Sequence, residues 1–210
     1  MSVGRIITSD ACVAEGAAFL ARIEPRFAAA LTETGPLPLR LKPDGFRALL
    51  DAIVSQQISV AAARGIWARM EAAGACSRAA IRRMSDQELR DCGLSRPKMR
   101  YARALAAAPV SFRALRSAPT DQVISELTQI TGIGTWTAEI YAMFSLGRAD
   151  VFAPGDLALQ EAARVLFALD TRPSEKAFRA MAAAWSPWQS VAARILWAYY
   201  RVIKNREGVR

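Results

Sequence analysis

Apolar residues recur every three or four positions along most of the chain, with alanine frequent between them. This spacing is typical of amphipathic helices, whereas the strict alternation of Val, Ile, Thr or Tyr that predicts strands is not found. One stretch, Gly35–Gly45, contains three prolines and indicates an ordered crossover. The sequence therefore predicts an all-α protein, with helices over Asp10–Arg22, Pro25–Thr34, Asp44–Ser55, Ser59–Ala73, Ser85–Cys92, Pro97–Ala107, Thr120–Ile130, Thr135–Leu146, Leu157–Ala168, Ser174–Trp185 and Ser190–Asn205.

These helices are expected to form one compact domain over residues 1–210, built from two helical lobes that flank a cleft. We expect the helices within 1–45 and those within 157–210 to pack as one lobe. Residues 46–155 are expected to form the other lobe, which includes a hairpin at 127–147.

The composition limits which partners and which kinds of catalysis are possible. The chain has 28 Lys and Arg against 19 Asp and Glu, and its net charge of +9 makes nucleic acid the leading partner. It has no histidine, which excludes Ser–His and Cys–His nucleophile pairs and removes the usual zinc ligand. Catalysis is left to carboxylates, lysine or backbone groups.

Cysteine usage and apolar runs bear on cofactors and location. Cys12, Cys76 and Cys92 are too scattered for a C-x-x-C pair and too few for a four-cysteine cluster, so we expect reduced, buried thiols, no zinc and no iron–sulfur cluster. No stretch approaches the ~18 uncharged apolar residues of a membrane span. The segment Ala11–Leu20, interrupted by Glu15, does not have the form of a signal peptide. We expect a cytoplasmic protein without membrane contact.

A Gly-Ile-Gly sequence at 132–134 leaves almost no room for a loop between two helices. Gly132 is suited to the left-handed conformation that ends a helix, Gly134 keeps side-chain bulk away from the turn, and Ile133 is expected to point into the core. The second helix then begins with backbone N–H groups and a positive dipole end, which suit a DNA phosphate. The alternative is an ordinary helical hairpin in which the glycines serve only the turn.

Asp156 follows Pro154-Gly155 and precedes the helix expected from Leu157. The plainest interpretation is an N-cap, since Asp is a preferred cap residue. A single carboxylate near a nucleotide is also enough to cleave an N-glycosidic bond. It stabilises the positive charge that develops on the sugar, and it orients or deprotonates the attacking water. Capping and catalysis are compatible.

Two segments together resemble the helix-hairpin-helix/Gly-Pro-Asp superfamily of DNA glycosylases: Gly132-Ile-Gly-Thr-Trp-Thr-Ala138 and Val151-Phe-Ala-Pro-Gly-Asp156. Three further segments are similar to its 3-methyladenine DNA glycosylase II type: Ser55-Gln-Gln-Ile-Ser59, Gly93-Leu-Ser-x-x-Lys98 and Trp185-Ser-Pro-Trp-Gln-Ser190. The resemblance spans Phe46–Trp197 and implies that Asp156 is the catalytic carboxylate of a base excision repair enzyme. The expected partner is double-stranded DNA with damaged bases, bound by a monomer.

The resemblance also gives the hairpin further roles. It implies DNA contacts by four residues: Gly132, Ile133, Gly134 and Thr137. It implies a monovalent cation, K⁺ or Na⁺, between the hairpin and a phosphate, held by the backbone carbonyls of Thr128, Ile130 and Gly132. No other cofactor is expected.

The lysines bear on strand cleavage. Bifunctional glycosylases form a Schiff base between the sugar and a lysine amine, and this chain has Trp136 at the hairpin position where such relatives carry that lysine. No lysine lies between the hairpin and Asp156, because the only lysines are Lys42, Lys98, Lys176 and Lys204. We therefore expect base removal without strand cleavage.

A base must leave the helical stack before it is cut, so the enzyme needs a pocket for it. Trp136 and, by resemblance, Trp197 are expected to line this pocket, because indole faces attract a cationic base such as 3-methyladenine or 7-methylguanine. Ile140 and Leu157 occupy positions where some relatives have further aromatics, so a more open pocket is expected. The alternative is that tryptophans belong to the hydrophobic core, as for Trp185, Trp188 and Trp197.

Polar residues between two apolar helices suggest a further DNA contact. By resemblance, Gln57 fills the gap left by the flipped base or bonds the widowed base, with Ile58 packing inward beside it. The alternative is that Gln56 and Gln57 cap or bridge helix ends inside the protein. Lys98 is expected to contact a second phosphate, and a solvated basic face is the alternative there.

The function predicted from the sequence is a monofunctional DNA glycosylase that excises alkylated purines by hydrolysing the N-glycosidic bond of a flipped nucleotide. Two alternatives stay open. One is a glycosylase for deaminated, oxidised or mismatched bases. The other is a non-catalytic helix-hairpin-helix protein that only binds DNA.

Overall fold

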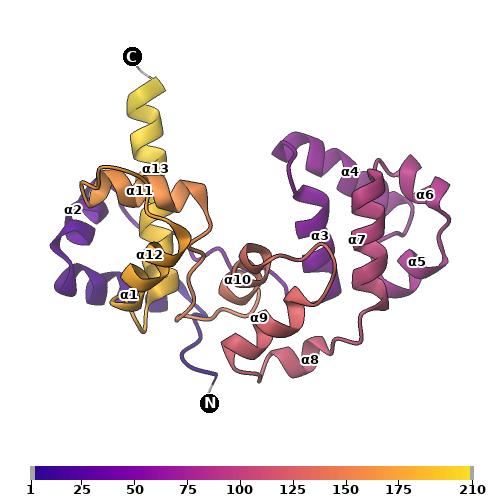
Figure 1. The fold of residues 1–210 in the computed structure, drawn as a ribbon, viewed down its shortest axis with the longest axis horizontal. Helices are drawn as coiled ribbons and strands as arrows, with labels where there is room; N and C mark the ends of the chain where they lie inside the picture. Colours follow the sequence, from indigo (N-terminus) through magenta and orange to yellow (C-terminus); the bar gives the residue numbers. More distant parts are fainter. Residues whose placement is uncertain (1–2, 209–210) are drawn as a thin grey trace. The chain divides into compact units, whose positions relative to one another are not determined.

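The all-α prediction is confirmed by the computed structural model, which describes residues 3–208 (Figure 1). Within these residues no strand occurs, and one isolated antiparallel bridge joins Ile6 to Arg148. Every expected helix is present. Two short helices, α5 and α8, were not expected, because six and four residues are too few to show a helical period. The described helices are α1 (Asp10–Ile23), α2 (Pro25–Thr34), α3 (Phe46–Ser55), α4 (Val60–Ala72), α5 (Arg78–Arg83), α6 (Asp86–Asp91), α7 (Arg96–Ala107), α8 (Phe112–Leu115), α9 (Thr120–Thr128), α10 (Thr135–Phe144), α11 (Leu157–Leu166), α12 (Glu175–Ala183) and α13 (Gln189–Gly208).

Serine side chains fix where many of these helices begin. A serine hydroxyl accepts a backbone N–H bond at the start of α1, α4, α5, α6, α8 and α12. At α6 the cap is reciprocal, because the Glu88 carboxylate accepts the Ser85 N–H at 2.6 Å, and this bond holds the pKa of Glu88 below its usual value. Each such cap stabilises its helix by about 1 kcal/mol.

The helices form two compact units. The terminal unit comprises Met1–Leu41 and Ala142–Arg210, and the hairpin unit comprises Lys42–Tyr141. The structure thus groups residues 142–155 with the terminal unit. The sequence analysis had expected them in the lobe formed by residues 46–155, together with the hairpin. The reason is backbone pairing near the N-terminus: the Ile7 N–H donates to Gly147 O at 2.7 Å, and the Ala149 N–H donates to Arg5 O at 3.0 Å.

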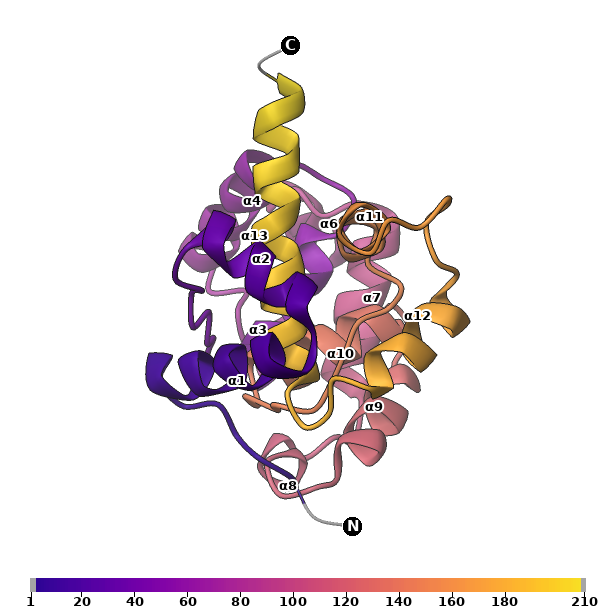
Figure 2. The same ribbon diagram turned by 90° about the vertical axis from the view of Figure 1, so that its left-hand side faces the viewer.

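Aromatic rings form the centre of the terminal unit. The Trp185 indole contacts four phenyl rings at centroid distances of 5.1, 5.4, 5.8 and 6.1 Å, those of Phe27, Phe152, Phe167 and Phe178. Helix α13 packs against α11, α2 and α1 (Figure 2). A Cβ at Gly16 would lie 2.6 Å from the Trp188 ring, so only glycine lets α1 approach that indole. Trp185 and Trp188 are therefore core residues, as the alternative interpretation held.

Helix α7 organises the hairpin unit, where it packs against α3, α5 and α6. Its buried face presents Met99, Ala102 and Leu105. One turn after Met99, the Arg103 guanidinium donates to Met84 O at 2.8 Å and to the Asp86 carboxylate at 2.7 Å, which fixes the connection between α5 and α6. The same helix carries Lys98 and Tyr101 toward the hairpin.

The cysteine prediction is only partly confirmed. All three thiols are free, but only Cys92 is buried, whereas Cys12 and Cys76 are half-buried. Cys12 lies in the first turn of α1, where its sulfur is 3.4 Å from the Ser9 hydroxyl, and this position near solvent explains why it is not a core residue. In the part of the chain described here, no helix combines the length and apolar composition required to cross a membrane.

Candidate functional site

The hairpin between α9 and α10 turns on Gly132, which has a φ of +96°. This left-handed conformation favours glycine, as the sequence predicted. A Cβ at this position would also lie 2.3 Å from the Tyr101 ring, so the turn rests directly on that side chain. Ile133 is buried in the hairpin unit, and its N–H donates to Ile130 O at 2.9 Å. Two constraints, one conformational and one steric, therefore require glycine at 132.

Helix α10 starts immediately after this turn. The Ala138 N–H donates to Gly134 O at 3.0 Å. Among residues 3–208, apart from the two chain neighbours of Gly134, no heavy atom lies within 4 Å of a Cβ built on this glycine. The space above the start of α10 is thus open to an approaching group, and a helix N-terminus attracts anions. Thr137, expected as a DNA contact, is buried, so its side chain is part of the helix packing and not of this open surface.

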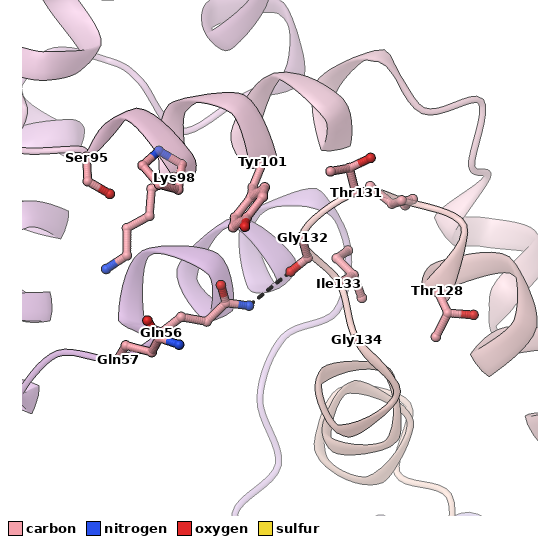
Figure 3. A pocket seen from close by; sticks show the side chains of 12 residues that line it. Gln56, Gln57, Ser95, Lys98, Tyr101, Thr128, Thr131, Gly132, Ile133 and Gly134 are labelled. Atoms are coloured by element: carbon pink, nitrogen blue, oxygen red, sulfur yellow. Dashed lines mark hydrogen bonds between the residues drawn. The ribbon is translucent and has the colours of Figure 1, made fainter.

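A polar depression of about 550 Å³ lies beside the hairpin within the hairpin unit (Figure 3). Its walls come from the hairpin turn, the start of α7 and the turn between α3 and α4: Gln56, Gln57, Ser95, Pro97, Lys98, Tyr101, Thr128, Ile130, Thr131, Gly132, Ile133 and Gly134. Across it, the Gln56 side-chain amide donates to Gly132 O at 3.0 Å. One of the two glutamines therefore bridges to the hairpin, as the alternative interpretation allowed.

Lys98 lies at the edge of this depression, and the residue is only 9% exposed. Its ammonium donates to Val54 O at 2.6 Å, near the end of α3. Burial lowers the pKa of Lys98 below its usual value. The solvated basic face considered for this lysine is therefore wrong, and its ammonium serves the C-terminal end of α3.

The turn between α3 and α4 projects two apolar side chains. Gln57 adopts a left-handed conformation with a φ of +56°, which is uncommon for a residue other than glycine. Ile58 is 37% exposed and Val60 is 70% exposed. Ile58 is therefore only partly covered, and it does not pack fully inward as expected.

The residues expected to hold a monovalent cation, Thr128, Ile130 and Gly132, all line the depression. Ile130 O already accepts the Ile133 N–H, and Gly132 O accepts the Gln56 amide. A carbonyl oxygen has two lone pairs, so each can accept a further ligand. The chemistry of these donors fits an alkali cation, which prefers uncharged oxygen. No cluster of three or more His, Cys, Asp or Glu side chains suited to a metal occurs among residues 3–208.

In the terminal unit, Asp156 is the N-cap of α11. Its Oδ1 accepts the backbone N–H groups of Ala158 at 2.9 Å and Leu159 at 3.0 Å. The same oxygen accepts the indole N–H of Trp197 at 3.3 Å. The cap interpretation is confirmed, and in addition the structure brings together Asp156 and Trp197, which lie 41 residues apart.

The loop before Asp156 is held firmly. Val151, Phe152 and Ala153 are buried, and the Gln160 amide donates to Pro154 O at 2.8 Å. The Trp197 indole is supported by the Phe144 ring, with centroids 5.6 Å apart. A carboxylate fixed by three donors on one oxygen keeps a defined orientation, which electrostatic catalysis requires.

The other expected pocket residues divide between the units. Leu157, next to Asp156, is 65% exposed, and Trp197 is half-buried in the terminal unit. Trp136 is 44% exposed and Ile140 is half-buried, both on the part of α10 that belongs to the hairpin unit. An indole exposed to this extent on the first turn of a helix is unusual for a core residue and is available to a ligand.

Comparison with known protein families shows to which family the chain belongs. A model of the HhH-GPD superfamily of base excision DNA repair proteins matches residues 50–189, well over half of the chain, and so includes both the hairpin and Asp156. The chain belongs to this superfamily.

Solved structures of two other proteins share the fold over most of the chain. A DNA-3-methyladenine glycosidase of Bacillus halodurans is 34% identical with a TM-score of 0.79, and the match covers 89% of each chain. The Schizosaccharomyces pombe 3-methyladenine DNA glycosylase Mag1, solved in complex with abasic DNA, is 28% identical with a TM-score of 0.76, over 87% of this chain and 95% of that one. The Bacillus subtilis protein YfjP is 34% identical over 121 residues, 56% of this chain but less than half, 42%, of its own length.

Three features of this HhH-GPD member were not anticipated from its sequence. Tyr101 supports the hairpin turn, Val60 is exposed beside the turn at Gln57, and Phe144 supports Trp197. Val60 had a local signal, because it directly follows the N-cap Ser59 and a first helical position often faces solvent. Tyr101 and Phe144 had none, since both act through residues that are distant in the sequence.

Proposed function

We propose that the chain is a monofunctional DNA glycosylase that removes alkylated purines from double-stranded DNA. The observation that carries this proposal is the fixed carboxylate of Asp156, held by two backbone N–H groups and an indole N–H in a member of the HhH-GPD superfamily. Relatives named as 3-methyladenine glycosylases or glycosidases support the choice of an alkylated purine.

In this mechanism the bond between C1′ of the sugar and the base nitrogen breaks, and its electron pair leaves with the base. A cationic alkylpurine therefore departs as a neutral molecule, while positive charge develops at C1′. The Asp156 carboxylate stabilises that charge and accepts the proton of the water that adds to C1′. The anchored Oδ1 holds the group in place, so little reorganisation is needed when the bond breaks.

Recognition of a cationic base is assigned in this proposal to an exposed indole. The face of Trp136, which is 44% exposed in the hairpin unit, attracts positive charge, with about 1–2 kcal/mol gained when the contact excludes water. A neutral, undamaged purine lacks this attraction to the indole face, and it is itself a poorer leaving group than a cationic base. Selection thus combines a stronger contact with an easier reaction.

The hairpin unit supplies the DNA grip in this proposal. The start of α10 binds a backbone phosphate, and a monovalent cation at the carbonyls of Thr128, Ile130 and Gly132 would add positive charge between the turn and that phosphate. The exposed turn with Gln57 and Ile58 enters the space that the flipped nucleotide vacates. Neither contact reads the sequence of the DNA.

The decisive experiment separates the two roles of Asp156. An asparagine keeps a side-chain oxygen that can accept the Ala158, Leu159 and Trp197 donors, whereas alanine removes it. We expect Asp156→Asn to retain the stability of the wild type but to lose methylated-base release by roughly 100-fold or more. Asp156→Ala should lose activity and also about 1 kcal/mol of unfolding free energy. Full activity of the Asn variant would refute the proposed role.

The substrate class is tested by mass analysis of bases freed from alkylated, deaminated and oxidised DNA. We expect 3-methyladenine and 7-methylguanine from the alkylated sample and little from the others. Release from deaminated or oxidised DNA alone would reassign the substrate, and release from none of the three would indicate a protein that only binds DNA.

The absence of lyase activity is tested separately with borohydride and abasic DNA. A Schiff base would be reduced to a stable covalent adduct. We expect neither an adduct nor strand cleavage, because Trp136 replaces the hairpin lysine and the buried Lys98 ammonium is engaged by Val54 O. A trapped adduct at any lysine would overturn this part of the proposal.

A further inference from the structure

The bond between the Gln56 amide and Gly132 O joins two segments that are 76 residues apart in the sequence (Figure 3). Gln56 is the C-cap of α3 and directly precedes Gln57. Gly132 is the turning residue of the hairpin. The single hydrogen bond therefore connects the exposed turn between α3 and α4 with the segment that starts α10.

Both ends of this bond are conformationally constrained. Gly132 has a φ of +96° and rests against the Tyr101 ring, so its carbonyl has a fixed direction. Gln57, next to the donor, has a φ of +56°, a conformation that costs about 1–2 kcal/mol for a residue with a side chain. Such a turn persists only when surrounding contacts hold it.

At the tip of the turn Ile58 is 37% exposed and Val60, the first residue of α4, is 70% exposed. Two polar bonds hold the base of the turn. The Lys98 ammonium donates to Val54 O, two residues before Gln56, and thereby ties the end of α3 to α7. Gln56 itself ties the turn to the hairpin. The two bonds have different partners, and only the second reaches the turn that begins α10.

We propose that Gln56 is a positioning residue that couples the turn at 57–58 to the phosphate-binding hairpin, so that gripping the backbone sets where the turn enters the DNA. This inference rests on the proposed function, which gives both segments their contacts with DNA. Gln56 does not itself touch the flipped base. It acts by fixing the spacing between the two contacts.

This coupling predicts a specific pattern of losses. Replacing Gln56 with Leu keeps the size of the side chain but removes its donor, and the loss of one such bond corresponds to about three- to tenfold in an equilibrium constant. The loss should appear in binding to DNA with an abasic-site analogue and in the fluorescence of 2-aminopurine placed opposite the site, which reports unstacking. Undamaged DNA, which the turn does not enter, should bind as before.

A double-mutant cycle distinguishes coupling from general support of the fold. We expect Gln56→Leu to cost about three- to tenfold in abasic-site affinity in the wild type but less than about twofold when Gln57→Ala and Ile58→Ala are already present. Gln122→Leu is the matched control, because the exposed Gln122 amide bonds within its own helix, to Glu126 at 2.7 Å. If Gln56→Leu lowers the unfolding midpoint strongly, Gln56→Met replaces it in the same cycle.

Equal losses in both backgrounds would overturn the inference, since Gln56 would then support the hairpin alone. No loss in either background would overturn it too. Both outcomes leave the proposed function intact, because methylated-base release by the wild type is measured independently. Failure of the wild type to release base or to prefer abasic DNA would instead refute the proposed function.

Discussion

At the scale of single residues, the two glycines of the hairpin are needed for different reasons. Gly132 is required by the protein itself, through its positive φ and the close Tyr101 ring. In the described part of the chain, only the sequence neighbours of Gly134 come near its Cβ position, so its lack of a side chain leaves room for a group that approaches from outside. Glycine is thus required by the fold at position 132, whereas at position 134 it keeps the surface open to a binding partner.

This difference gives a paired prediction. Gly132→Ala should lower the unfolding free energy by about 2 kcal/mol, because a Cβ there is strained and meets Tyr101. Gly134→Ala should change stability by less than about 0.5 kcal/mol but weaken binding to abasic DNA. Urea denaturation and DNA titration of both variants check this. Equal destabilisation by the two substitutions would contradict it.

Cys12 gives a second prediction at this scale. Hydrogen bonds, chiefly from the Ser9 hydroxyl, lower the pKa of Cys12 to about 7, whereas burial raises the pKa values of Cys76 and Cys92. Because the thiolate is the reactive form, alkylation of Cys12 by iodoacetamide should rise most steeply between about pH 6 and 8 and then level off. Ser9→Ala should move this rise to higher pH. Peptide mass spectrometry measures it, and a Cys12 profile like that of Cys92 would disprove the assignment.

At the scale of elements, α7 supports the site through Lys98. Its ammonium satisfies a carbonyl at the end of α3, where helical carbonyls have no partner within the helix. The lysine thereby links the helix that precedes the exposed turn to the helix that supports the hairpin. Its burial makes this role structural, although the sequence motif that contains it suggested a phosphate contact.

Lys98→Met should therefore lower the unfolding free energy by about 1.5–3 kcal/mol, the range for hydrogen bonds to charged groups. The dependence of DNA affinity on salt should stay the same. Arg96→Met, two residues earlier on the exposed start of α7, is the control and should leave stability within about 0.5 kcal/mol of the wild type. A stable Lys98→Met protein with a reduced salt dependence would instead support a phosphate contact.

Most elements were predictable from the sequence, because helical periodicity is a local property. The long helices and the left-handed Gly132 are examples. The boundary between the units was not, since residues 142–155 join the terminal unit through backbone bonds to the N-terminal segment. Such pairing leaves no trace in the pattern of apolar residues.

The candidate site shows the same limit. The sequence indicated Asp156 as a cap, and resemblance to a family was needed to suggest catalysis. The partial exposure of Ile58 was missed, and so was the left-handed conformation of the preceding Gln57, which is uncommon for a residue other than glycine. The Trp197 bond to Asp156 follows from the packing of α13 against α11, which no local pattern specifies.

At the scale of the whole molecule, the net charge of +9 is carried mainly by arginine, which accounts for 24 of the 28 cationic residues once the 4 lysines are subtracted. Arginine stays charged at every physiological pH and pairs well with phosphate. Long-range attraction to DNA should therefore be nearly independent of pH and strongly dependent on salt.

If three phosphates are neutralised, raising the salt from 50 to 200 mM should weaken abasic-DNA binding by about 40-fold. Base release under conditions where the DNA is fully bound should change little, because the chemical step involves no counterion release. Titrations at several salt concentrations, with single-turnover rates at each, test both statements. A salt-independent affinity would rule out phosphate contacts as the main source of binding.

The cap at the start of α11 links reaction rate to local order. Helix ends open with smaller free energies than whole domains, and each such opening would release the two N–H groups that orient the Asp156 carboxylate. The enzyme would then be inactive while almost all of its structure is intact. Its temperature optimum should consequently lie below its melting temperature, with turnover reporting the fraying of one helical turn.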